Sequence, residues 1–514
     1  MKLDLARRLK PLATALSAAV LTFAVGATVM QPSKAEAAGT LRVGLLADLN
    51  NYDPMQFSAI NFFLIKNLYD SVIDYDDKGN PLPALASSWE IAPDNKSVTL
   101  HLRDDVKFQS GNAMDAESVA ATLAKAADPQ KGKNAYATMA IVKDWTVTDP
   151  STITINMNNP VPDRQILDLL QFLAPIDPAG MDAVETVPAG TGPFLLEDRV
   201  VGQSVTLKKN PNYWRPDEPK LDEIVFTIFS DSGAASAALE SGSIDLMYSG
   251  TSRDAVRLRD AGFQVFQGPG KLVQVFRINT TRAPFTNEKF RQAFNYLMNR
   301  EAILKAGYAG LGVVTALPWA PVSPAVDDSY TEKYTYDLAK GKAMIDESGL
   351  SDAEKSGWKL LTNGGNEESV LISQIVQATL AEIGINIELD VKQGAEMTDA
   401  MLGGDFAATF GGIGNVQKFP SRVATNSIYR TKNNPVLGEP HPFPAYVDAI
   451  AQVDSAFGED VQKAYDNLNK VLIESSFAIP TNSYEIGLIV AAPNVSGITL
   501  DIDNLLVGRT IEVK

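Results

Sequence analysis

Residues 68–89 read LYDSVIDYDDKGNPLPALASSW, and with LHLRDDVKF at residues 100–108 they hold the main local signals of the first part of the chain. Tyr75 to Pro81 is rich in charged and turn-forming residues, which predicts a solvated turn. Trp89–Ile91 and Ser97–Leu102 flank a turn at residues 92–96, and alternation of apolar residues in the second segment predicts a β-hairpin. Asp115 then provides an N-cap for a helix predicted over Ala116–Ala127.

The same mixture of strands and helices continues outward from this region. Alternating apolar residues predict strands at 40–46, 152–157, 194–196, 205–207, 224–229, 273–278 and 385–391. Apolar residues at helical spacing predict helices at 59–68, 234–239, 287–298, 337–347, 368–382 and 461–474. Strict βαβ alternation is lacking, so the predicted class is α/β in the mixed α+β sense. Since the sequence shows no internal repeat and no low-complexity linker, we expect crossing strands to join the domains as a hinge.

Composition excludes several classes of function. The chain has 514 residues, 45% of them hydrophobic, and a formal net charge of -17. This length suggests two to four domains, and the excess of acid argues against a nucleic-acid partner. There is no cysteine, which excludes thiolate metal sites, disulfides, cysteine nucleophiles and a lipoprotein anchor. With only His101 and His441, a multi-histidine metal site is excluded as well.

The N-terminus has the pattern of an export signal. Basic residues precede an apolar run at residues 12–30, and Ala35-Glu36-Ala37 suits signal peptidase. We therefore predict a signal peptide at residues 1–37, cut near Ala37, and a free periplasmic protein. An uncleaved membrane anchor is the alternative, because the apolar run nearly reaches the ~20 residues that span a bilayer. Arg7-Arg8 hints at a twin-arginine signal in place of the general one, but the residues around it match poorly.

Motifs for catalysis or nucleotide binding are weak. Gly268 to Lys271 is too short for a phosphate loop, and Leu272 stands where Ser or Thr is needed. Asp74 to Gly79 begins like a calcium loop, but Lys78 occupies a ligand position. No nucleophile-elbow or dinucleotide-binding motif is present. We expect no enzyme activity, no cofactor and no resident metal.

Several blocks, in a fixed order, carry a family resemblance. They are residues 68–73 and 80–89, residues 100–108 with Gly111 and Ser118-Val119, residues 190–194, 209–214 and 239–245, and residues 279–285 and 291–294. This ordered set resembles the family 5 solute-binding proteins of ABC importers, the peptide, nickel and opine group. It covers the chain from about Thr40 to the C-terminus.

The resemblance implies a two-lobe clamshell of the periplasmic-binding-protein type with an extra subdomain in its first lobe. Lobe I is expected at residues 38–82, 191–278 and 483–514, the extra subdomain at 83–190, and lobe II at 279–482. Two strands near Gln274–Arg277 and Asn482–Tyr484 would cross between the lobes. Such a protein captures a small molecule between its lobes and delivers it to an ABC permease in the inner membrane. We expect it to act as a monomer.

The resemblance also suggests where a ligand binds. The segment after the Asp53-Pro54 turn offers Phe57, Ser58 and Phe62, and the extra subdomain offers Phe172. From lobe II, the strand at residues 407–410 continues into a glycine-rich segment that suggests Phe410, Gly412 and Asn415 as ligand contacts. Lys418 and Arg422 follow, and an arginine there can bind a carboxylate through two parallel hydrogen bonds.

These residues predict an acidic ligand. Many peptide binders carry Trp and Asp in the segment where this chain has glycines and Asn415, so an ammonium group would be poorly compensated here. We therefore expect a peptide-like, opine-like or other carboxylate-bearing compound. A nickel or metal-chelate binder is the alternative, favoured if His441 faces the cleft. A periplasmic hydrolase is a more distant one, since one histidine can serve a serine triad.

Overall fold

The structure is a computed structural model, and it describes residues 39–514 except 50, 57–60, 77, 269–271, 415–419, 427, 433, 435, 485–487, 502 and 504–505. Contacts group the chain into two units, Met1–Ala37 and Ala38–Lys514. The first unit, which contains the predicted signal peptide, lies outside the described residues.

A seven-stranded sheet contains both early and late segments of the chain. Its strands, in spatial order, are β12 (Gln264–Phe266), β19 (Leu488–Ala491), β11 (Leu246–Gly250), β1 (Thr40–Leu45), β10 (Glu223–Ile228), β9 (Ser204–Lys209) and β8 (Phe194–Val200). Central β1 runs parallel to both neighbours and buries Leu41, Val43 and Leu45. Parallel pairing on both sides explains why its alternating residues are so deeply buried. The accompanying helices are α1 (Phe62–Leu68), α4 (Ser232–Glu240) and α5 (Ser252–Asp260).

A four-stranded antiparallel sheet follows the first signature block. Its order is β4 (Ala86–Ile91), β5 (Ser97–Leu102), β7 (Thr152–Met157) and β6 (Val142–Asp149), with helices α2 (Ala116–Ala127) and α3 (Asp163–Phe172) beside it. The predicted hairpin and helix cap are confirmed: β4 pairs with β5, and the Asp115 carboxylate accepts a hydrogen bond from the Ser118 N–H at 2.9 Å. Buried residues of this sheet and of the seven-stranded sheet form one apolar cluster. Short 3₁₀ helices occur at Lys133–Ile141 and Met181–Ala183.

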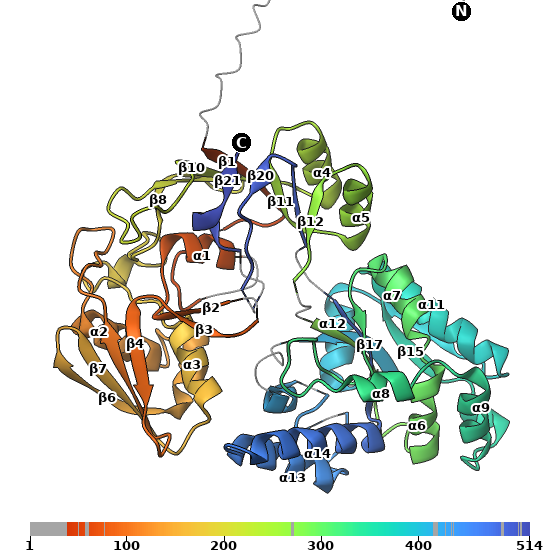
Figure 1. Cartoon of the computed structure of the whole chain (residues 1–514). Coiled ribbons are helices and arrows are strands. Elements are labelled where there is room, and N and C mark those ends of the chain that lie inside the picture. Colours follow the sequence, from red (N-terminus) through yellow and green to blue (C-terminus); the bar gives the residue numbers. More distant parts are fainter. Residues whose placement is uncertain are drawn as a thin grey trace, which may run out of the picture. The chain divides into compact units, whose positions relative to one another are not determined.

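A six-stranded sheet occupies the middle of the sequence. Its order is β14 (Val313–Val314), β18 (Ala478–Tyr484), β13 (Leu272–Ile278), β17 (Ala408–Ile413), β15 (Lys359–Asn363) and β16 (Glu388–Lys392). Figure 1 labels several of the helices that surround it. The helices of this region are α6 (Glu288–Leu297), α7 (Arg300–Tyr308), α8 (Asp328–Lys333), α9 (Leu338–Asp346), α10 (Asp352–Lys355), α11 (Glu367–Glu382), α12 (Gly394–Gly403), α13 (Pro444–Ser455) and α14 (Asp460–Ser475), of which α10 is not labelled in the figure.

The six-stranded sheet packs in apolar clusters that are separate from those of the other sheets. Their buried members all come from residues 273–479. One of them is largely aromatic: Phe276 of β13 stacks on Phe294 of α6 with ring centroids 5.1 Å apart, and Phe410 of β17 lies 5.2 Å from Phe276. Large buried rings contribute much of the apolar area that stabilises such a cluster. The six-stranded sheet therefore has a core separate from that of the other two large sheets.

The two strands expected to cross between lobes pair with each other in the six-stranded sheet. Gln274 of β13 lies opposite Asn482 of β18. The chain leaves the seven-stranded sheet after β12, enters the six-stranded sheet at β13, and returns from β18 to β19. The two passages between these sheets are thus the short segments at 267–271 and 485–487, which lie partly or wholly outside the described residues.

Three signature blocks meet at one buried carboxyl group. Asp70 accepts hydrogen bonds from Tyr213 Oη at 2.8 Å, Trp214 Nε1 at 2.9 Å and Thr191 Oγ1 at 3.1 Å. A Cβ on Gly192 would lie 2.3 Å from the Leu68 carbonyl carbon, so only glycine allows this approach. These blocks thus hold the seven-stranded sheet to the segment after α1, and their role is structural.

Two smaller hairpins and some shifted boundaries complete the fold. The hairpins are β2 (Ile73–Tyr75) with β3 (Pro81–Pro83), and β20 (Val495–Ser496) with β21 (Glu512–Val513). The first confirms the predicted turn. The strand predicted over 385–391 begins only at Glu388, where its pairing with β15 starts. The preceding residue, the buried Ile387, uses its carbonyl oxygen to accept a hydrogen bond from Gln377 Nε2 instead. The mixed α/β class is confirmed.

Candidate functional site

A cavity of about 650 Å³ is lined by residues of both the seven-stranded and the six-stranded sheet regions. This volume falls in the range of small-molecule sites. Gly250, Thr251 and Ser252, at the end of β11 and the start of α5, line it from one sheet region. From the other, the lining residues are Gln274, Arg277, Tyr308, Asn363, Asn366, Glu368, Ser369, Met397, Thr398, Met401, Leu402, Phe410, Gly411, Gly412 and Tyr484.

Gly411 and Gly412 of β17 lie at the wall of this cavity, and side chains from β13 and β18 cover them. A Cβ on Gly411 would lie 2.5 Å from Arg277 Cζ, and a Cβ on Gly412 would lie 2.8 Å from Tyr484 Oη. The sequence suggested Gly412 of this segment as a ligand contact. The structure shows that the space directly above the two glycines holds Arg277 and Tyr484.

Arg277 is buried and makes few contacts. Arg277 is 8% exposed, and its Nη2 donates a hydrogen bond to the Gly412 carbonyl oxygen at 2.6 Å. Its Nε is buried with no hydrogen-bond partner. Burial lowers the pKa of the guanidinium from its ordinary value, and the nearby Tyr429 and Tyr484 oppose this shift. An arginine nevertheless keeps its positive charge in proteins.

Other polar groups face the same cavity. The rings of Tyr308 and Tyr484 lie with centroids 4.3 Å apart. Burial raises the pKa of Tyr308, so its hydroxyl stays protonated. Gln274 is 5% exposed, and Asn366 caps α11 by accepting from the Ser369 N–H at 2.6 Å. Glu368 in the first turn of α11 supplies a negative charge beside these groups. The site thus offers one buried cation, several neutral hydrogen-bonding groups and one carboxylate.

The structure brings only some of the predicted contacts together. Phe410 and Gly412 line the large cavity. Phe62 and Phe172 lie with ring centroids 5.8 Å apart and line a separate small pocket beside Pro54. Arg422, whose side chain is 43% exposed, lies 3.6 Å from the Asp168 carboxylate of α3. Phe57, Ser58, Asn415 and Lys418 lie outside the described residues. Ligand contact by any of the nine stays a prediction.

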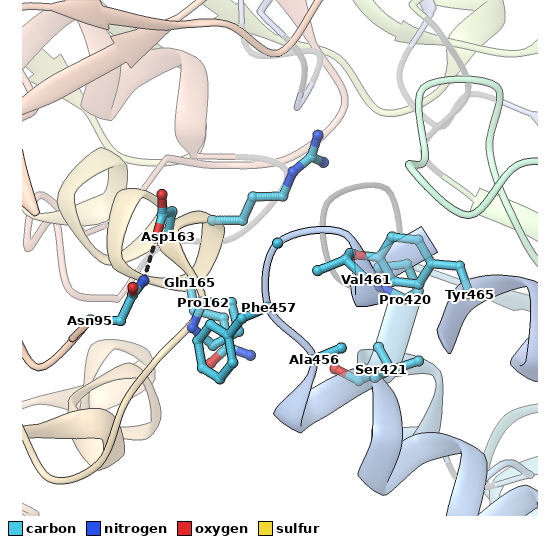
Figure 2. Close-up of a pocket in the computed structure, with 13 residues that line it drawn as sticks. Asn95, Pro162, Asp163, Gln165, Pro420, Ser421, Ala456, Phe457, Val461 and Tyr465 are labelled. Atoms are coloured by element: carbon cyan, nitrogen blue, oxygen red, sulfur yellow. Dashed lines mark hydrogen bonds between the residues drawn. The ribbon is translucent and has the colours of Figure 1, made fainter. Parts of the chain in front are cut away.

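A second cavity, of about 350 Å³, is lined by residues that include Ser421 and Gln165. In the sequence, Ser421 precedes Arg422 and Gln165 lies three residues before Asp168, the two residues of the ion pair. Figure 2 shows Asn95, Pro162, Asp163 and Gln165 on one side of it and Pro420, Ser421, Ala456, Val461 and Tyr465 on the other. Asn95 donates a hydrogen bond to the Asp163 carboxylate. This cavity is therefore a place where the four-stranded sheet region faces the helices α13 and α14.

His441 packs against aromatic residues. Its ring stacks on Tyr446 with centroids 5.8 Å apart, and its Nδ1 accepts from the Phe443 N–H at 3.2 Å. Burial lowers the pKa of His441 below 6.5, which favours the neutral form. Neither cavity described above includes it. In the described part of the chain, no cluster of three or more acidic or histidine side chains is placed to hold a metal.

Sequence reasoning missed Arg277, Gln274, Tyr308 and Tyr484 as site residues. It identified the strand that carries Gln274 and Arg277, but only as a hinge. The signal was present: in residues 272–278, LVQVFRI, these two are the polar residues of an otherwise apolar strand. A buried polar residue is more informative than a buried apolar one.

Comparisons with known proteins agree with this fold. A family model described as bacterial extracellular solute-binding proteins, family 5 Middle, matches residues 80–435. Glutathione-binding protein GsiB of Escherichia coli (strain K12) is 27% identical over 371 residues, which cover 71% of each chain. In the described residues, no helix is both long and apolar enough to cross a membrane.

Solved structures show the same architecture. The chain is similar to AgaA in complex with agropinic acid, from A. tumefaciens R10, at 23% identity and a TM-score of 0.72, covering 93% of this chain and 99% of that one. It is also similar to NikA from Brucella suis in complex with Fe(III)-EDTA, at 22% identity and a TM-score of 0.79, covering 92% and 100%. These likenesses show the two-lobe periplasmic-binding-protein fold. With a family model matched over most of its length, the chain belongs to the family 5 bacterial extracellular solute-binding proteins, which bind small ligands for ABC importers.

Proposed function

We propose that this protein captures a small organic solute in the 650 Å³ cavity, and that the solute is peptide-like, opine-like or otherwise carries a carboxylate. The observation that carries the proposal is the composition of the cavity wall, to which residues beside β11 and residues of β13, β17 and β18 all contribute. A ligand in such a cavity touches both parts of the protein, so it stabilises the arrangement that brings them together.

The proposed lobes are those expected from the sequence: residues 38–82, 191–278 and 483–514 in lobe I, 83–190 in its extra subdomain, and 279–482 in lobe II. The apolar clusters support a division between the sheets, since the four- and seven-stranded sheets share one cluster and the six-stranded sheet has its own. They differ from the expected bounds at β13, because the buried residues of this strand, which those bounds assign to lobe I, belong to the clusters of the six-stranded sheet. The hinge would lie where the chain passes from β12 to β13 and from β18 to β19, next to the strands near Gln274–Arg277 and Asn482–Tyr484 that the sequence predicted for this role. Two short connections permit rotation about one axis but restrict other motions.

We also propose where the protein acts and what it acts with. A signal peptide at residues 1–37, cut near Ala37, would direct the chain to the periplasm, where it would act as a monomer and deliver its ligand to a permease. No bond is made or broken in this cycle, so the protein would not be an enzyme. The names of GsiB and AgaA, one a glutathione-binding protein and the other in complex with agropinic acid, support a ligand with carboxylate groups.

Identification of a co-purified compound tests this proposal. The full-length chain is produced with its own N-terminal segment in a Gram-negative host and purified without denaturant from the periplasmic fraction. It is then denatured, and the released small molecules are identified by mass spectrometry. We expect one organic acid at close to one equivalent, with unchanged mass after prolonged incubation with the protein. A protein retained in the membrane fraction, or one that converts the compound, would contradict the proposal.

A further inference from the structure

We propose that Arg277 is the anion anchor of the cavity, which binds a free carboxylate of the captured solute through its guanidinium group. This inference rests on the proposed capture of a solute in that cavity. The sequence had suggested Arg422 as the carboxylate-binding arginine. We assign this role instead to Arg277 of β13, the strand next to the proposed hinge.

Arg277 has no counter-charge among the described residues. Within the part of the chain that the structure describes, no carboxylate lies within salt-bridge distance of Arg277, and its buried Nε lacks a hydrogen-bond partner. Burial of an unpaired charge is costly, and proteins therefore pair buried charges. Because Arg277 also lines the cavity, a carboxylate from a bound molecule would supply the missing partner.

Two other buried arginines of the same region, Arg300 and Arg291, also have no carboxylate within salt-bridge distance among the described residues, and Arg300 Nη2 is buried without a partner. They differ from Arg277 in the number of backbone carbonyls that they bind. Arg300 is 5% exposed, and its Nε and Nη1 donate to four carbonyl oxygens, those of Thr315, Pro480, Asn295 and Tyr334. Arg291 is also 5% exposed and donates to carbonyl oxygens of Phe285 and Thr286. Neither lines the large cavity. These two arginines have structural partners within the fold, whereas Arg277 has one carbonyl and an open cavity.

The fold also holds the guanidinium group of Arg277 in place. A Cβ on Gly411 would lie 2.5 Å from Cζ, 2.7 Å from Nε and 2.8 Å from Nη2 of Arg277, so only glycine leaves room for the group against β17. The bond from Nη2 to the Gly412 carbonyl fixes its orientation. A planar, pre-oriented guanidinium loses little entropy when it binds a carboxylate.

Arg422 is a weaker candidate for this role. It lies 3.6 Å from the Asp168 carboxylate, so its charge has a partner before any ligand binds. Its side chain is 43% exposed, and water screens charges at such positions. We therefore expect Arg422→Gln to change carboxylate binding far less than Arg277→Gln does, which makes it the matched control.

The test measures binding of defined probes by calorimetry. The probes are reduced glutathione, N-acetyl-trialanine and succinate, each compared with its full methyl ester. We expect the wild type to prefer acids to esters. Arg277→Gln should bind the acids about 10- to 100-fold more weakly and lose the preference, since a hydrogen bond to a charged group accounts for a difference of this order. Arg277→Lys should retain part of the affinity, and Gly411→Ala should resemble Arg277→Gln because it displaces the guanidinium.

Thermal unfolding of each variant separates loss of the site from loss of the fold, and Arg277→Lys keeps the test valid if Arg277→Gln does not fold. Equal binding of acid and ester by the wild type, or unchanged acid binding by Arg277→Gln, would overturn the role of Arg277 and leave the proposed capture of a solute standing. If the wild type binds no probe and releases no compound on denaturation, the proposed function itself is contradicted, and this inference with it.

Discussion

A buried ion pair holds the loop that precedes the predicted ligand contacts Phe57 and Ser58. Lys125 Nζ of α2 lies 2.6 Å from Asp53 Oδ2, with side chains only 8% and 1% exposed. The other carboxylate oxygen, Oδ1, accepts from the Met55 N–H at 2.9 Å. Replacing Lys125 by Met keeps most of the apolar stem but leaves the Asp53 carboxylate buried without its counter-charge.

The structure supplies a matched comparison for the size of this effect. Lys208 Nζ and Glu197 Oε1 also lie 2.6 Å apart, but their side chains are 51% and 48% exposed. Removing one partner of a buried pair costs about 3–5 kcal/mol of unfolding free energy, because the remaining charge has lost its solvation. An exposed pair contributes about 0.2–1 kcal/mol. Lys125→Met should therefore destabilise the protein several-fold more than Lys208→Met.

Urea denaturation followed by tryptophan fluorescence measures both variants under the same conditions. The double variant Lys125→Met/Asp53→Asn, which removes both charges, should recover part of the loss. The reasoning is refuted if Lys125→Met costs no more than Lys208→Met, since burial would then have no influence on an ion pair of equal length.

Three further outcomes follow from the structure. Tyr213→Phe leaves the buried Asp70 carboxyl group without one donor and should cost about 1–3 kcal/mol of unfolding free energy in urea, whereas the same change at Tyr136, which is 46% exposed, should cost almost nothing. Burial lowers the pKa of His441 from 6.5 in the folded protein, so the unfolded chain takes up the proton at a higher pH than the folded protein does. The free energy of unfolding should therefore fall as the pH drops below 6.5. In urea titrations at pH 7.5 and 5.5, it should fall less for His441→Gln than for the wild type. The compound released from the native protein should reduce the radius of gyration in small-angle scattering, and an unchanged radius across a verified titration would count against lobe closure.

The sequence predicted those features whose physical cause is local. An alternating strand, the Asp115 cap and the turn at 75–81 each depend on residues a few positions apart. The bounds predicted for α2 and β5 are those of the structure, and β13 begins one residue earlier than predicted. The ordered blocks carried the family resemblance, although their residues serve packing around Asp70 more than ligand binding.

The site itself depends on contacts that no local pattern contains. Arg277 and Gly411 are far apart in the sequence, and only the pairing of β13 with β17 places the guanidinium over the glycine. Arg422 looked available for a ligand until the fold brought it to Asp168. The sequence by itself thus determined the elements, the fold class and the family, because these follow from short-range periodicity and residue order. Only the tertiary structure decided which cation lies in a cavity without a counter-charge, because burial and pairing arise from residues that are distant along the chain.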